Sequence, residues 1–150
     1  MRKRLVAALP LAALTIAVLA FVVASTAFAG GRPLSADLSG ANEVPPVSTG
    51  DPDGSGTANL TLNQGQGEIC LEIEVQDIAQ PTLQHIHRGA AGTNGPVVVD
   101  FTPLLAQGGD GCVSADPALV KEIRQNPEGF YFNVHTGDFL GGAVRGQLSR

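Results

Sequence analysis

Residues 68–76 alternate strictly between polar and apolar side chains over nine positions, EICLEIEVQ. Because the side chains of a β-strand point alternately to opposite faces of a sheet, this pattern predicts a strand with one buried face. Other short segments have strand-like composition and are separated by residues typical of turns, mainly Gly, Pro and Asn. These segments cover residues 35–40, 56–62, 82–88, 97–101, 130–136 and 143–148. The chain is therefore expected to be all-β.

One segment departs from the strand pattern and predicts a short helix over residues 117–125. Asp116 is a favourable N-cap, and Pro117 follows at the first helical position. Apolar residues then recur at helical spacing: Leu119, Val120 and Ile123. Asn126-Pro127 ends the helix. We expect a Greek-key β-sandwich or barrel-like domain, with this one helix inside a crossover loop.

The N-terminal residues have the pattern of an export signal. A basic stretch, residues 2–4, precedes an almost wholly apolar stretch, residues 5–24. Ala27-Phe28-Ala29 is a small-x-small cleavage site, so residues 1–29 are predicted to be a signal peptide and residues 30–150 the domain. The apolar stretch is about long enough to cross a bilayer, so a retained anchor is the alternative. The expected location is secreted or periplasmic, with no membrane span after cleavage.

The charge balance excludes some partners. The whole chain has 9 basic and 14 acidic residues, and removal of residues 2–4 leaves 6 basic against 14 acidic, a net charge of −8. A surface of this sign repels nucleic acid and anionic lipid, so no nucleic-acid partner is expected. The same charge is compatible with the binding of a cation. The length of residues 30–150 suits one domain with a single core.

Cys70 and Cys112 are the only two cysteines. An exported chain with an even number of cysteines favours a disulfide, which would stabilise the fold by about 3–4 kcal/mol in the chain-entropy model. Two free thiols are the alternative. The alternation of residues 68–76 places Cys70 on the polar face, so the bridge would connect an outer strand face to a loop that contains Cys112.

All three histidines lie in two strand-like segments. His85 and His87 share one face of their strand, and Ile86 points to the other face. In the second segment His135 lies on the face opposite the apolar residues Phe130, Phe132 and Val134. If both apolar faces point into one core, the three imidazoles emerge together on its outer surface.

Three converging imidazoles are a candidate metal site. Neutral imidazole binds Cu, Zn, Fe and Ni, and the general affinity order favours Cu(II), so copper, or else zinc, is the expected ion. We expect the three ring nitrogens to lie within about 4 Å of one another if they share one ion. Asp100, Tyr131 or Asp138 would serve as a further ligand or as a hydrogen-bond acceptor that supports the ligands. Arg145 would guide an anion to the histidines or pair with a carboxylate, and we expect the ordinary salt bridge. The alternative is structural: the imidazoles bond to backbone carbonyls and anchor loops 89–96 and 136–142.

Three motifs in order along the chain resemble the CHRD family, named after repeats in chordin and found in many exported bacterial proteins. They are LSGANEVPP at residues 38–46, HIHRG at residues 85–89 with the glycines and proline that follow, and NVHT at residues 133–136 followed by GAVRGQL at residues 142–148. The resemblance covers about residues 38–148 and implies a compact β-sandwich. The His-x-His strand with a later strand histidine is also similar to the copper half of Cu/Zn superoxide dismutases, but this chain has no histidines left for a zinc loop.

Two functions follow as hypotheses. The resemblance implies a secreted, non-catalytic binding module whose ligand is an extracellular protein or a glycan. The alternative is a transition-metal protein that stores, delivers or uses the ion for redox chemistry through His85, His87 and His135. No arrangement of a nucleophile with a base stands out, so an enzyme is the less expected outcome.

Overall fold

The computed structural model describes residues 31–150, so the predicted signal peptide lies outside the described residues. The strands are β1 (Arg32–Ser39), β2 (Ser55–Asn63), β3 (Glu68–Gln76), β4 (Pro81–Arg88), β5 (Val97–Asp100), β6 (Gly111–Ser114), β7 (Phe130–Thr136) and β8 (Val144–Gln147). The helices are α1 (Pro117–Gln125) and three short 3₁₀ turns, η1 (Gly40–Asn42), η2 (Thr102–Gln107) and η3 (Pro127–Gly129). Across this part of the chain, no helix combines the length and apolar character that crossing a bilayer demands.

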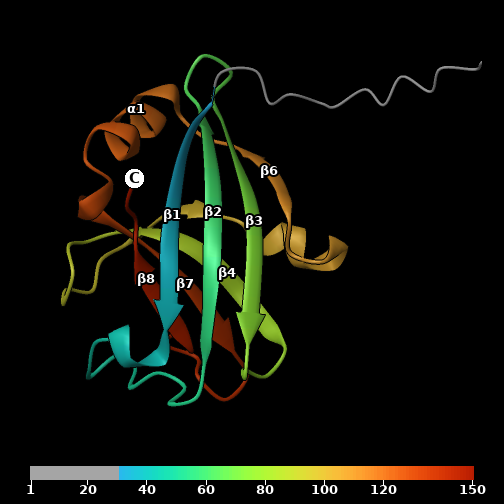
Figure 1. The fold of residues 1–150 in the computed structure, drawn as a ribbon, viewed down its shortest axis with the longest axis vertical. Coiled ribbons are helices and arrows are strands. Elements are labelled where there is room, and N and C mark those ends of the chain that lie inside the picture. Colours follow the sequence, from blue (N-terminus) through green and yellow to red (C-terminus); the bar gives the residue numbers. More distant parts are fainter. Residues whose placement is uncertain (1–30) are drawn as a thin grey trace, which may run out of the picture.

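The strands form one antiparallel sheet in the order β5-β4-β7-β8-β1-β2-β3-β6. The sheet curls on itself into two layers, with β1, β2 and β3 in front of β4, β7 and β8 in Figure 1. The chain changes layer after β3, after β5 and through α1, which gives the Greek-key character expected from the sequence. The all-β prediction is confirmed, as is the single short helix in a crossover.

The core lies between the two layers and is filled by the inward faces of both. Leu60 of β2 and Ile69 of β3 come from the front layer, and Ile86 of β4 and Phe132 of β7 come from the back layer. On α1, Val120 and Ile123 are fully buried and close one end of the core. The Asp116 side chain accepts a hydrogen bond from the Ala118 amide, as its N-cap position predicts. The periodicity of each element therefore decides which residues point away from this core.

The disulfide between Cys70 and Cys112 is present, but its setting differs from the prediction. Cys112 lies in strand β6, directly opposite Cys70 of β3, and not in a loop. The sequence pattern missed β6 because the strand has only four residues, begins at Gly111 and follows the Gly108-Gly109 turn. A strand this short has too few residues to show an alternation of polar and apolar side chains.

Candidate functional site

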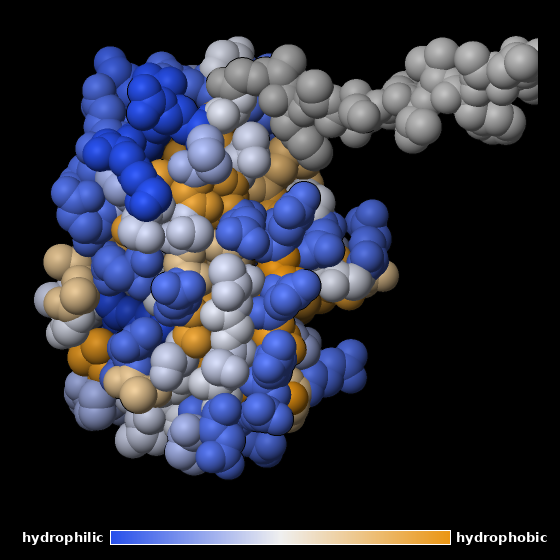
Figure 2. Space-filling model, viewed as in Figure 1, coloured by the Kyte–Doolittle hydropathy of each residue, from blue (hydrophilic) through white to orange (hydrophobic). Residues whose placement is uncertain are grey.

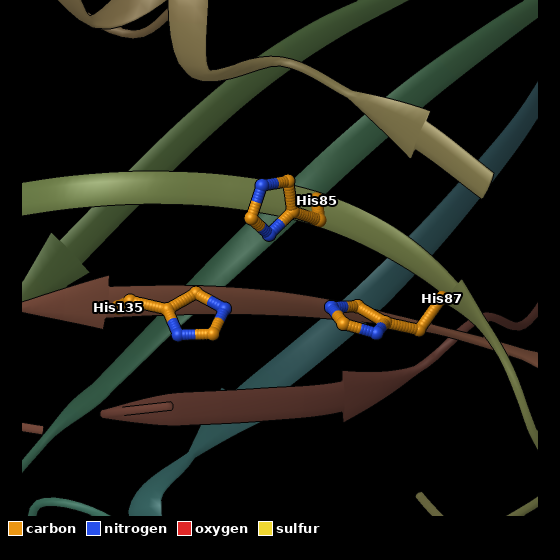
Figure 3. A group of neighbouring side chains, drawn as sticks. All are labelled: His85, His87 and His135. Carbon is orange, nitrogen blue, oxygen red and sulfur yellow. The ribbon is translucent and has the colours of Figure 1, made fainter. Parts of the chain in front are cut away.

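The three histidines lie on neighbouring strands of the back layer. Strands β4 and β7 are paired, with His85 opposite Asn133 and His87 opposite Tyr131. Ile86 between the two histidines is fully buried in the core, so both imidazoles point to the other face of the sheet. The ring centroid of His135 is 5.2 Å from that of His85 and 6.3 Å from that of His87. The sheet therefore brings the three rings together, as Figure 3 shows.

The cluster is not on an open surface, which corrects the expectation from the sequence. Only 9% of His85 and 8% of His135 is exposed, and His87 is half-buried. Loops 89–96 and 136–142, which follow β4 and β7, cover this face of the sheet. Strand alternation predicts the face on which a side chain lies, but it gives no information about loops that fold back over that face.

Each imidazole uses one ring nitrogen to hold the covering structure. His87 Nδ1 donates to the carbonyl oxygen of Gly95 at 2.9 Å, and His135 Nδ1 donates to that of Leu140 at 2.9 Å. Because a carbonyl oxygen only accepts hydrogen bonds, the proton of both rings is on Nδ1 and Nε2 carries a free lone pair. For His85, Nε2 lies 3.4 Å from Thr102 Oγ1 and 3.5 Å from an Asp100 carboxylate oxygen, which leaves Nδ1 for another partner.

The remaining ring nitrogens are buried and have no hydrogen-bond partner among the described residues: His85 Nδ1, His87 Nε2 and His135 Nε2. One ligand atom of each histidine lies within 4.8 Å of those of the other two. Figure 3 shows a nitrogen of each ring turned toward the same space. Two nitrogens on one ion at bonds of about 2.1 Å are at most about 4.2 Å apart, so the three nitrogens lie near the separation that one shared ion requires.

Burial keeps the three imidazoles neutral at physiological pH. It lowers the pKa of His85 to about 4, with the neighbouring His135 adding to the effect. Burial also lowers the pKa of His87 and that of His135, and in each the hydrogen bond to a backbone carbonyl opposes it. Neutral imidazole is the form that binds a metal ion. The site is thus in its ligand-ready protonation state at pH 7.

A stack of planar side chains supports His87. The Tyr131 ring is stacked on the His87 ring, with centroids 4.8 Å apart, and the Arg145 guanidinium lies 3.3 Å from the Tyr131 centroid on β7. Arg145 is only 2% exposed. Its guanidinium donates to the carbonyl oxygens of Ala90 and Thr93, and so fixes the loop that carries the Gly95 acceptor. Arg145 is therefore a buried positioning residue, and within residues 31–150 it forms no ion pair.

A buried carboxyl group, which the sequence did not single out, adjoins this arrangement. Glu43 is 8% exposed and accepts a hydrogen bond from Asn133 Nδ2. Asn133 Oδ1 is a further buried acceptor, and it has no partner in the described part of the chain. Burial raises the pKa of Glu43 to about 7, although the charge of Arg145 opposes this rise. Glu43 is part of the motif at residues 38–46, which is the sequence signal that points to it.

Of the four residues expected near the histidines, three lie at the site and one does not. Asp100, Tyr131 and Arg145 lie at the site as described above. Asp138 is exposed and, within residues 31–150, forms no hydrogen bond or ion pair with a histidine. Its position in the 136–142 loop placed it near His135 in sequence, but the loop approaches His135 through the Leu140 carbonyl instead.

Gly142 provides a test of how closely the loops fit the site. Its backbone has φ +133°, and a Cβ there would lie 2.4 Å from Glu43 Oε1 and 2.6 Å from Asn133 Nδ2. We expect Gly142→Ala to lower the free energy of unfolding by about 2 kcal/mol, because backbone strain adds to displacement of the buried pair. Denaturant unfolding measures the effect. Gly137→Ala is the matched control from the same loop, since a Cβ there meets nothing within 4 Å, and equal effects of the two changes would contradict this account.

Comparison with known proteins was made against family models, curated sequences and solved structures. The model of the CHRD domain matches residues 34–148, which is most of the chain. The chain belongs to the CHRD domain family. All three histidines and Glu43 lie inside the matched region of this CHRD domain. The searches of curated proteins and of solved structures each returned no match.

Proposed function

We propose that this CHRD domain is a non-catalytic binding module whose ligand is one transition metal ion, held by His85, His87 and His135. The observation that carries the proposal is the set of three buried ring nitrogens with free lone pairs that face one space. Buried acceptors without partners are costly, and a cation bound to all three removes that cost. Orientation of metal-binding histidines through their second ring nitrogen is typical of metal sites, and each of these rings has that support.

Copper is the ion that we favour, with zinc as second choice. A set of three neutral nitrogens suits both ions, and Cu(II) binds more tightly than Zn(II) to a given site of nitrogen ligands. The net charge of −8 for residues 30–150 favours a cation over an anionic ligand. We propose that binding takes place outside the cytoplasm, secreted or periplasmic, where the predicted signal peptide would direct the chain. A protein or glycan partner stays a prediction.

The pH dependence of binding follows from the pKa values. Histidines with ordinary pKa values near 6.5 begin to lose metal to protons just below neutral pH. Burial lowers the pKa of all three rings here, that of His85 to about 4, so protons compete only at lower pH. We therefore expect the Cu(II) dissociation constant to change less than about threefold between pH 7.5 and pH 6.5. Calorimetric titrations at fixed ionic strength measure it, and a tenfold weakening over this range would contradict the lowered pKa values.

Titration of the purified protein with Cu(II), in competition with a weak chelator, tests the proposed function itself. The expected result is one equivalent that the chelator does not remove. Complete removal of the ion by the weak chelator would show that the histidines have another role, namely the anchoring of the loops.

A further inference from the structure

The structure assigns a second metal site, at the disulfide, which is available only after reduction: Cys70 and Cys112, together with Glu68, form a three-ligand set for a thiophilic divalent ion such as Zn(II). The site lies in the front layer, on β3 and β6, and is separate from the histidine cluster in the back layer. It does not depend on the function proposed for the histidines. Sulfur and carboxylate ligands together are typical of zinc sites, with Zn–S bonds of about 2.3 Å.

The ligand atoms are already close together. Glu68 Oε1 lies 3.6 Å from Cys70 Sγ, and ligand atoms of all three residues lie within 4.8 Å of one another. Asn63 Nδ2 donates to the same Glu68 oxygen at 3.4 Å, which orients the carboxylate from the neighbouring strand β2. After reduction, two thiolates on one Zn(II) ion lie about 3.8 Å apart, a separation that directly opposed residues of paired strands can reach.

The strand pairing that opposes the two cysteines does not depend on the disulfide alone. Glu68, Ile69 and Leu71 of β3 also pair with β6, and Ala115 donates to the carbonyl oxygen of Gly67 at 2.8 Å. Val113 of β6 packs against the core. These contacts keep β6 beside β3 when the disulfide opens, so the thiols stay opposite each other.

A hollow of about 470 Å³ gives a reductant and an ion access to the sulfur atoms. Both cysteines line it, and so do carboxylates, which attract cations: Glu72, Glu74 and Asp110. Cys112 is exposed, whereas Cys70 is buried. In Figure 2 hydrophilic side chains gather over β3, which forms one wall of the hollow. Cys112 is therefore the sulfur that a reductant can reach.

The reductant is a dithiol. One of its thiolates attacks Cys112 Sγ, forms a mixed disulfide and releases Cys70 as a thiolate. Its second thiol then displaces Cys112, so the dithiol leaves as its own disulfide and the two cysteines take up two protons. Binding of Zn(II) releases both protons, because the metal binds thiolates.

Zn(II) titrations of the oxidised and the phosphine-reduced protein test the inference, with Co(II) as a spectroscopic substitute. We expect the reduced protein to bind one equivalent more than the oxidised protein, with a thiolate-to-cobalt charge-transfer band in the near ultraviolet. Cys112→Ser, treated in the same way, should show neither change. Glu68→Gln should weaken this equivalent by about tenfold, whereas Asp37→Asn, at an exposed position of β1 that does not line the hollow, should leave it unchanged.

Metal bound by the oxidised protein is assigned to the histidines, because the cysteines are then in the disulfide. The two sites are therefore tested separately, and either can fail without the other. An equal number of equivalents before and after reduction would overturn the inference. Loss of the β-sheet circular dichroism signal on reduction would also overturn it, since the site needs β6 to remain paired with β3.

Discussion

Replacement of His135 by alanine is expected to weaken Cu(II) binding at least 100-fold, by a loss of about 3 kcal/mol or more of binding free energy. The change removes one of three nitrogens that share the ion. It also releases the Leu140 carbonyl, which the ring holds at 2.9 Å, so the 136–142 loop loses an anchor at the site. Isothermal titration or competition with a chelator of known affinity measures the loss.

Leu140→Ala is the matched control for this change. The Leu140 side chain is 77% exposed, while its carbonyl oxygen is part of the backbone and remains available to His135. The control should bind Cu(II) with unchanged affinity. An affinity of His135→Ala close to that of Leu140→Ala would mean that the ion, if bound, is held elsewhere.

Replacement of Arg145 by methionine is expected to lower the free energy of unfolding by about 3–5 kcal/mol at pH 8. Methionine fills part of the space, but it leaves the carbonyl oxygen of Thr93 without its donor and removes the cation stacked on Tyr131. It also removes the positive charge that opposes the raised pKa of Glu43. The loop that holds the His87 acceptor should loosen at the same time.

The loss should depend on pH in a defined direction. The pKa of Glu43 is about 7 in the folded protein, against an ordinary value of 4.5, so its stabilising contribution is complete below pH 4.5 and is lost as the pH rises through 7. Without Arg145 this pKa rises further, because an ionised Glu43 then lacks a nearby positive charge. We therefore expect a smaller loss at pH 5, about 2 kcal/mol, mainly from the Thr93 carbonyl that is left without a donor.

Urea unfolding of wild type and variant at pH 5 and pH 8 measures both values. Arg32→Met, at an exposed position of β1, is the matched control and should change stability by less than about 0.5 kcal/mol. If Arg145→Met lowers the free energy of unfolding equally at pH 5 and pH 8, the charge of Arg145 does not act on Glu43. If the loss is as small as that of Arg32→Met, the described packing of Arg145 is contradicted.

Local patterns predicted the features that depend on near neighbours in the chain. The alternation of residues 68–76 matches β3, and the capping residues of segment 117–125 match α1. The alternation of side chains along a strand also predicted that His85 and His87 of β4 lie on the same face of the sheet as His135 of β7. These predictions succeeded because the position of a side chain relative to its own backbone is set by secondary structure alone.

The features that were missed depend on contacts between residues far apart in sequence. Glu43 lies 90 positions from Asn133, and no periodicity relates the two. The burial of the histidines comes from loops whose course the turn residues do not determine. Arg145 was expected to form an ordinary salt bridge, but it lies inside the molecule under loop 89–96. Composition cannot show that a single strand arginine will be covered by a loop from another part of the chain.

The most direct test of the central claim is a crystal structure of the Cu(II)-loaded protein with anomalous diffraction recorded at the copper edge. The account predicts one strong anomalous peak about 2.0–2.1 Å from each of three atoms, His85 Nδ1, His87 Nε2 and His135 Nε2, with the bonds to the Gly95 and Leu140 carbonyls kept. The absence of a peak between the three rings at full copper loading, or a peak bound by other residues, would contradict it.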